Sequence, residues 1–185
     1  MRASKRPLRT VSTLMAGVAL ALAAPSVAAA HDCHNAGLDP SAARASAIEH
    51  TTLCLLNHER RARGLEPLRA ETRLSRAAQR HSDDMTRRYY FAHVSPGGSD
   101  LRTRLAHAGY LRGAGSWSAG ENIAWGSGWR ARPLEIVASW MASPGHRANI
   151  LSPAYRQIGL GVTPGVPQPG VAGGATYTTD FGARD

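Results

Sequence analysis

Three ionisable side chains lie beside glycines or turn-forming residues, where groups that bind or react are often placed. His93 follows Phe-Ala, Glu121 lies between Gly120 and Asn122, and His146 follows Pro-Gly. Imidazole nitrogens bind zinc, and a carboxylate can serve as a metal ligand, as the partner of a ligand or as a general base. Because nothing in their spacing forces the three together, the pattern alone is only a weak indication of a site.

The sequence lacks the stronger enzyme signatures. It contains no Gly-x-Ser-x-Gly elbow, phosphate-binding loop, His-Glu-x-x-His helix or Cys-x-x-Cys pair. Ser143, close to His146, has two interpretations: a nucleophile or a helix cap followed by Pro144 in the first turn. We favour the cap, because a nucleophile would need a base and an orienting third group within reach. His81, on an apolar stripe, is interpreted as a packing residue.

The elements that must position these residues follow from hydrophobic periodicity and turn signals. We expect helices at 41–63, 72–88 and 99–108 and another that begins at Pro133, with strands at 121–125, 156–163 and 175–182. Gly64 and Gly109 end the first and third helices, Ser99 caps the third, and residues 164–174 form a long hairpin loop. Helices come first and strands late, which indicates an α+β fold rather than a parallel βαβ sheet.

The N-terminal segment resembles a secretory signal peptide. A basic start precedes an apolar stretch at 11–24, and Ala28-Ala29-Ala30 offers small residues for cleavage. The apolar stretch is shorter than the roughly 20 residues that span a bilayer, so we expect no transmembrane anchor after cleavage. We divide the chain into a signal peptide (1–30), a tail with the start of the first helix (31–47) and one folded domain (48–185).

The two cysteines, Cys33 and Cys54, form an isolated pair. In the oxidising environment outside the cell, such a pair is expected to form a disulfide. The alternative is a catalytic thiol, but Cys54 lies on an expected helix with no aligned base nearby. The bridge would tie the tail to the first helix and stabilise the fold by roughly 3 kcal/mol in the loop-entropy model.

The chain is basic, with a formal net charge of +9, and Lys5 is its only lysine. A basic surface can bind nucleic acid, lipid headgroups or cell-wall polymers. Here the arginines are spread along the chain and interrupted by acidic residues, without a run of five or more basic residues in the expected mature part. We therefore expect a solvated surface and no specific nucleic-acid binding.

Five segments in a fixed order carry a resemblance to a known family. They are Asn-His-Glu-Arg-Arg-Ala-Arg-Gly at 57–64, Phe-Ala-His at 91–93, Gly-Glu-Asn-Ile-Ala at 120–124, Trp-Met-Ala-Ser-Pro-Gly-His-Arg at 140–147 and Ile-Gly-Leu-Gly at 158–161. Together they resemble the bacterial branch of the CAP superfamily of cysteine-rich secretory, antigen 5 and pathogenesis-related proteins. The resemblance covers about residues 50 to 183. It implies a three-layer α–β–α sandwich with a central antiparallel sheet.

The resemblance also implies a cleft lined by two histidines and, in many members, two glutamates. His93, Glu121 and His146 match three of these positions, whereas Ser143 stands at the position of the second glutamate. Asn122 and Arg147 would brace the cleft by hydrogen bonds. Because a neutral hydroxyl replaces one family carboxylate, the chain lacks one of the four residues on which an activity of the full set would depend.

From these features we expect a secreted protein that binds an extracellular ligand, such as a lipid, a cell-wall component or a protein. His93 and His146 would bind a divalent metal, zinc being the expected ion, and no organic cofactor is expected. The alternative is a metal-dependent hydrolase of the cell envelope or extracellular space, for which Glu121 is the candidate catalytic residue. A purely structural envelope protein is a third hypothesis.

Overall fold

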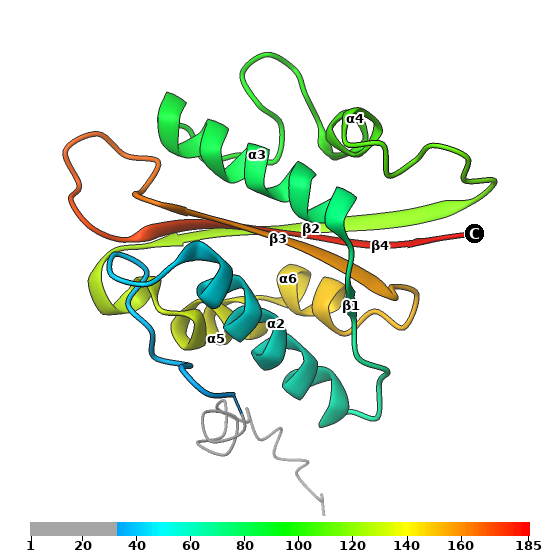
Figure 1. Ribbon diagram of the computed structural model, residues 1–185, viewed down its shortest axis with the longest axis horizontal. Coiled ribbons are helices and arrows are strands. Elements are labelled where there is room, and N and C mark those ends of the chain that lie inside the picture. Colours follow the sequence, from blue (N-terminus) through cyan, green and yellow to red (C-terminus); the bar gives the residue numbers. More distant parts are fainter. Residues whose placement is uncertain (1–32) are drawn as a thin grey trace, which may run out of the picture.

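A four-stranded sheet lies at the centre of the molecule (Figure 1). The structure is a computed structural model that describes residues 33–185, so the expected signal peptide lies outside the described residues. Across the sheet the strands follow the order β1 (Arg69–Ala70), β3 (Gln157–Pro164), β4 (Ala175–Arg184) and β2 (Trp117–Gly126). Within residues 33–185, no helix is long and apolar enough to cross a membrane.

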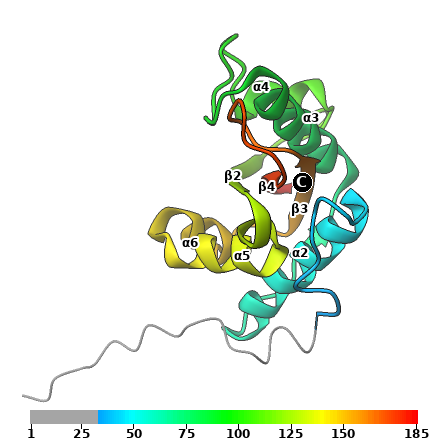
Figure 2. The ribbon, with the colours of Figure 1, turned by 90° about the vertical axis from the view of Figure 1, so that its left-hand side faces the viewer.

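Helices cover both faces of the sheet, as expected for an α–β–α sandwich (Figure 2). One layer contains α3 (Thr72–Arg88) and α4 (Leu101–His107), and the other contains α2 (Ala45–Arg61), α5 (Pro133–Ala142) and α6 (Pro144–Ile150). A short 3₁₀ helix, η1 (Gly128–Ala131), precedes α5. The class of fold expected from the sequence is therefore confirmed.

The sheet is mixed, not wholly antiparallel as expected. β2–β4 and β3–β4 are antiparallel, but the two-residue strand β1 runs parallel to β3. The reason lies in the connection that follows, because the chain passes from β1 almost directly into α3, and α3 packs against β3. Strand β1 must therefore enter the sheet beside the start of β3.

The expected helices form, with differences at their ends. Helix α3 spans the expected residues, whereas α2 begins later than expected because Ser41 hydrogen-bonds to Asp39 in a preceding turn. Helix α4 is capped by Asp100, which accepts from the Thr103 amide at 2.8 Å, and not by Ser99 as expected. The amide of Ser99 instead donates to the hydroxyl of Ser95 within the preceding loop.

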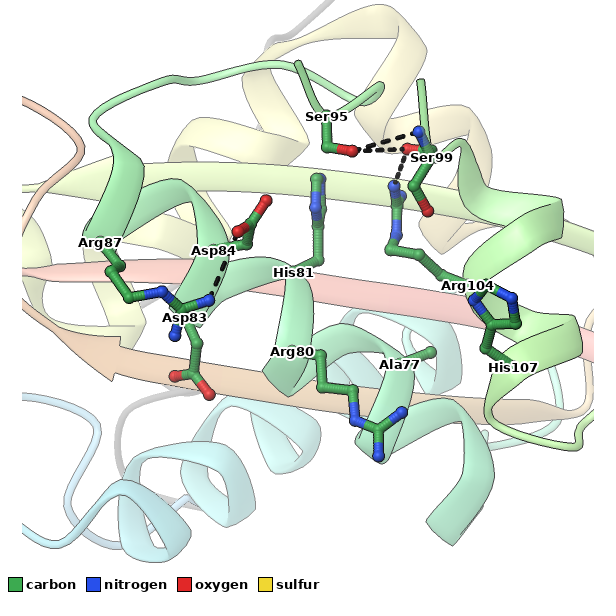
Figure 3. Close-up of a pocket in the computed structure, with 10 residues that line it drawn as sticks. All are labelled: Ala77, Arg80, His81, Asp83, Asp84, Arg87, Ser95, Ser99, Arg104 and His107. Atoms are coloured by element: carbon green, nitrogen blue, oxygen red, sulfur yellow. Dashed lines mark hydrogen bonds and ion pairs between the residues drawn. The ribbon is translucent and has the colours of Figure 1, made fainter. Parts of the chain in front are cut away.

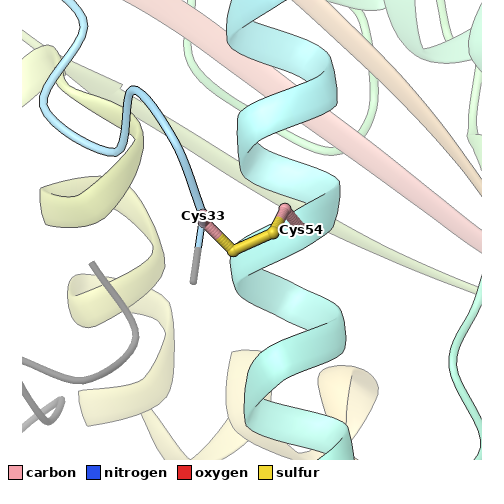
Figure 4. The surroundings of a disulfide bond; sticks show 2 residues. All are labelled: Cys33 and Cys54. Carbon is pink, nitrogen blue, oxygen red and sulfur yellow. A yellow bond between two sulfur atoms is a disulfide. The ribbon is translucent and has the colours of Figure 1, made fainter. Parts of the chain in front are cut away.

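The larger hydrophobic core lies between the sheet and the layer of α2, α5 and α6. Trp140 is its largest fully buried side chain and donates a hydrogen bond from Nε1 to the carbonyl of Ile123 on β2. The expected disulfide is present, and Figure 4 shows Cys33 joined to Cys54 on α2. This bridge attaches the N-terminal tail to the core layer.

The opposite layer approaches the sheet unusually closely. A Cβ atom on Gly161 would lie 2.2 Å from the backbone nitrogen of Gln79, and one on Gly159 would lie 2.0 Å from the carbonyl carbon of Leu74. Contacts this short require glycine at both positions. The two glycines on β3 therefore allow α3 to lie directly against the sheet.

Candidate functional site

Strand β2 forms one edge of the sheet and brings two of the expected residues into place. Glu121 is paired with Asp180 on β4, and its side chain is almost fully buried on the α3–α4 side. The next residue, Asn122, faces the other layer, because successive side chains alternate across a sheet. Its Nδ2 donates to the carbonyl of His146 on α6 at 3.1 Å.

His93 and Glu121 form a direct pair. His93 Nδ1 lies 2.7 Å from Glu121 Oε1, and the His93 side chain remains 55% exposed while that of Glu121 is 3% exposed. The hydrogen bond to Glu121 raises the pKa of His93, although partial burial opposes this shift. A carboxylate on one ring nitrogen fixes the tautomer and leaves Nε2 available to a metal or ligand.

Arg104 on α4 fixes the loop that carries His93 through hydrogen bonds to its backbone. Its Nη1 donates to the carbonyls of His93 and Ser99, each at 2.9 Å, and its Nη2 donates to Glu121 Oε2 at 2.5 Å. Figure 3 shows the Arg104 side chain extending from its helix toward Ser99. One buried guanidinium thus fixes both the loop and the carboxylate.

His81 supports the same loop, which agrees with its interpretation as a packing residue. Its Nε2 lies 3.1 Å from the carbonyl of Ala92 and 4.0 Å from Glu121 Oε2. Burial lowers the pKa of His81 to about 4, despite the opposing charge of Glu121. The ring is therefore neutral near pH 7 and donates from Nε2 to Ala92.

His146 reaches the site from the opposite layer, in the first turn of α6. Partial burial lowers its pKa, and so does the nearby charge of His93. Asn149 on the same helix donates to the carbonyl of Glu121 at 3.1 Å and to Oδ1 of Asn122 at 2.9 Å. We call His93, Glu121 and His146 the edge site.

Two other residues expected in the cleft, Ser143 and Arg147, make no side-chain hydrogen bond to the edge site. Ser143 occupies the N-cap position of α6 in an extended conformation, but its side chain makes no capping hydrogen bond. Arg147 is exposed, and its side chain has no hydrogen-bond or ion-pair partner among residues 33–185. Asn149 makes the bracing contacts expected of Arg147.

A pocket of about 330 Å³ is lined in part by His81 and Arg104 (Figure 3). Because both residues also lie against Glu121, the pocket is next to the edge site. Its lining comes from α3, α4 and the loop between them: Ala77, Arg80, His81, Asp83, Asp84, Arg87, Ser95, Ser99, Arg104 and His107. Arg104 was not among the site residues expected from the sequence. One signal was available, because Arg104 lies one turn from Leu101, on the inward face of an amphipathic helix.

Comparison with known proteins agrees with this fold. Residues 53–170 match the model of the CAP, or cysteine-rich secretory protein, family. The chain therefore belongs to this family, and the resemblance inferred from the sequence is confirmed.

Two relatives illustrate the match. The chain is 38% identical over 137 residues to the protein YkwD of Bacillus subtilis (strain 168), covering 74% of this chain and 47% of YkwD. It is 35% identical over 116 residues to the B. subtilis membrane protein YlbC, covering 62% of this chain and 31% of YlbC. The chain thus spans less than half of these curated relatives.

Among solved structures, an extracellular SCP-domain protein from Bacillus anthracis superimposes with a TM-score of 0.61 at 28% identity. The match covers 74% of this chain and 40% of the other.

Proposed function

We propose that this chain is an exported CAP-domain protein whose edge site binds zinc and, together with the metal, an extracellular ligand. The observation that carries the proposal is the contact between His93 and Glu121. A buried carboxylate orients a half-exposed imidazole, which is how proteins commonly prepare a histidine for a metal. His146 approaches from the other layer and supplies the second imidazole.

The two imidazole groups of the edge site fit zinc, although they would give the metal only two protein ligands. His93 would bind through Nε2, since Nδ1 is engaged by Glu121. Among residues 33–185, no three side chains of His, Cys, Asp or Glu are grouped to hold a metal ion. With His93 and His146 as its protein ligands, we expect modest affinity and coordination positions left for water or for a ligand. A zinc ion there would act as a Lewis acid toward an oxygen or nitrogen atom of the ligand.

The contacts of Glu121 favour binding over metal-dependent hydrolysis. Burial opposes its ionisation, yet the hydrogen bond from His93 and the charge of Arg104 lower its pKa below the ordinary value. A general base is most effective when its pKa lies near the working pH. Because Glu121 holds its proton weakly and both its oxygens have donors, we assign it the role of orienting His93.

Export is supported by the expected signal peptide and by the disulfide, which persists in oxidising compartments. The similar protein from B. anthracis is an extracellular protein. For the ligand we retain the three classes expected from the sequence: a lipid, a cell-wall component or a protein.

Calorimetric titration of zinc into metal-free protein tests the proposal. We expect wild-type protein to bind zinc, and His93→Ala and His146→Ala each to weaken binding by at least tenfold. His50→Ala, an exposed position on α2, is the matched control and is expected to bind as wild type does. No binding by the wild type, or equal binding by both site variants, would refute the metal site.

Zinc binding should also depend on pH, because a metal competes with protons for imidazole nitrogen. Since the pKa of His93 is raised above its ordinary value of 6.5, affinity should begin to fall at a higher pH than for an unperturbed histidine. In the Glu121→Gln variant the fall should move to lower pH. Titration of zinc across a pH series measures both.

A further inference from the structure

Asp180 is an ionisable residue next to the edge site that the proposed function does not use. It lies on β4, directly opposite Glu121 on β2 and opposite Gly159 on β3. Directly opposed residues on antiparallel strands share one face of the sheet, so the carboxyl groups of Asp180 and Glu121 lie side by side. Helix α3, which closes on the sheet above Gly159, covers this position.

The surroundings of Asp180 offer it no hydrogen-bond donor. The residue is 0% exposed, and among the described residues no donor reaches either of its carboxyl oxygens. The hydrogen-bonding neighbour of its side chain is Glu121, whose carboxylate can accept but not donate. The charged groups near it are Glu121 on β2 and Arg104 on α4, and the Arg104 Nη2 donates to Glu121. From α3, the ionisable side chain that faces Glu121 is His81, which is neutral because burial lowers its pKa. An ionised carboxylate here would lack both solvent and donors.

The two adjacent carboxyl groups are therefore unequal. Glu121 receives one hydrogen bond from His93 and one from Arg104, and both stabilise its ionised form. Asp180 has no such partner, and two neighbouring carboxylates in a buried site cannot both ionise readily. Burial and the charge of Glu121 raise the pKa of Asp180 well above its ordinary value. The proton of the pair consequently resides on Asp180.

We propose that Asp180 is a neutral carboxylic acid that donates a hydrogen bond to Glu121 and thereby holds this carboxylate in place against His93. Asp180 does not contact a ligand in this arrangement, so it is a positioning residue that acts through Glu121. Its importance for binding rests on the proposed function of His93. Its protonation and its hydrogen bond do not, and they can be measured without metal.

The arrangement gives Glu121 donors from three parts of the fold: the loop before α4, α4 itself and β4. A carboxylate held this way cannot turn toward solvent without leaving Asp180 and Arg104 buried and unpaired. A protonated carboxylic acid can donate a hydrogen bond, whereas a carboxylate cannot. Protonated Asp180 is therefore the third donor to Glu121, after His93 and Arg104. An amide at this position would donate equally well.

Two measurements on metal-free protein test the inference. Carbon NMR of protein labelled at the aspartate carboxyl carbons should show one protonated carboxyl near pH 7, and this signal should be absent in Asp180→Asn. The pKa of His93, from imidazole NMR, should be nearly unchanged in Asp180→Asn, which keeps a donor and no charge. It should shift down toward 6.5 in Asp180→Leu, which has no donor.

Asp83→Asn is the matched control, since Asp83 lies on α3 and accepts hydrogen bonds from Gln79 and Thr163. This variant should keep the protonated signal and the pKa of His93. An ionised Asp180 near pH 7 would overturn the inference, and so would a large fall of the His93 pKa in Asp180→Asn. An unchanged His93 pKa in folded Asp180→Leu would refute the positioning role. Failure of zinc binding alone would refute the proposed function and leave this inference standing.

Discussion

Glu121 is 8% exposed, yet its side chain is paired with His93 from a loop and with Arg104 from α4. Its backbone carbonyl also accepts a hydrogen bond from Asn149 in the opposite layer. A single residue thus links the segments that carry both imidazoles. At the scale of residues, we therefore expect the pKa of His93 and the stability of the protein to depend strongly on the charge of Glu121.

Replacing Glu121 by Gln should destabilise the protein by about 3 kcal/mol, because it leaves the buried charge of Arg104 without its counter-ion. The same change should shift the pKa of His93 down toward 6.5, since the carboxylate that raises it is gone. Urea unfolding and imidazole NMR measure the two effects. Glu59→Gln is the control: it removes the i,i+4 ion pair with Arg63 and should cost less than about 1 kcal/mol.

Replacing Asp180 by Asn should stabilise the protein at pH 7. The unfolded chain ionises Asp180 near its ordinary pKa, whereas the folded chain keeps the proton, so folding must take up a proton at neutral pH. The stability contributed by Asp180 is thus complete below about pH 3.8 and declines as the pH rises toward the folded pKa. Because Asn does not titrate, the advantage of the variant should grow from pH 4 to pH 7. A constant difference in unfolding free energy over this range would contradict the prediction.

At the scale of elements, local patterns predicted most of the helices. Helix α3 spans the expected residues 72–88, and His81, expected on its apolar stripe, is buried with Leu74, Ala77, Ala78 and Met85. The ends were less predictable where two adjacent residues can both cap a helix, as Ser99 and Asp100 can before α4, where Asp100 is the cap. Strand β2 is longer than the expected 121–125. Its first residues were not expected to be part of the strand, because their sequence lacks the alternation of apolar and polar residues that indicates one.

The site was predictable only in part, and the reason is strand register. His93, Glu121 and His146 stood out because each lies beside glycine or turn-forming residues in a segment that resembles the family. Asp180 did not, because its role depends on the pairing of β4 with β2, between residues far apart in the sequence. Hydrophobic periodicity indicates which face a residue occupies but not which residue lies opposite it.

The close packing of α3 on β3 leads to a further prediction. In Gly161→Ala, the new methyl group would meet backbone atoms of Gln79, which cannot move unless the helix moves. We expect a loss of about 3 kcal/mol in unfolding free energy, as for other overpacked cores. Gly145→Ala is the control, since a Cβ there meets nothing within 4 Å, and it should be neutral or stabilising by up to about 1 kcal/mol. Equal stability of the two variants would show that α3 can withdraw from the sheet without cost.

At the scale of the whole molecule, the edge site joins two layers that are otherwise separated by the sheet. His93 belongs to the layer of α3 and α4, and His146 belongs to the layer of α2, α5 and α6. A metal bound by both would connect these layers at the edge formed by β2. Ligand binding would then stabilise the folded state as a unit, in proportion to the logarithm of ligand concentration above the Kd.

The disulfide lies in only one of these layers, which separates its effect on stability from any effect on His93. The bridge closes a segment with a sequence separation of 21, so a double Cys33→Ser, Cys54→Ser variant should lose about 3 kcal/mol of unfolding free energy. The pKa of His93 should stay as in the wild type, because the side chains of Glu121 and Arg104 set it. Both belong to the face of the sheet that α3 and α4 cover, whereas α2 covers the other face. Denaturant unfolding and imidazole NMR of the same samples compare the two. A shift of the His93 pKa in the folded variant would mean that the tail and the edge site are coupled through the core.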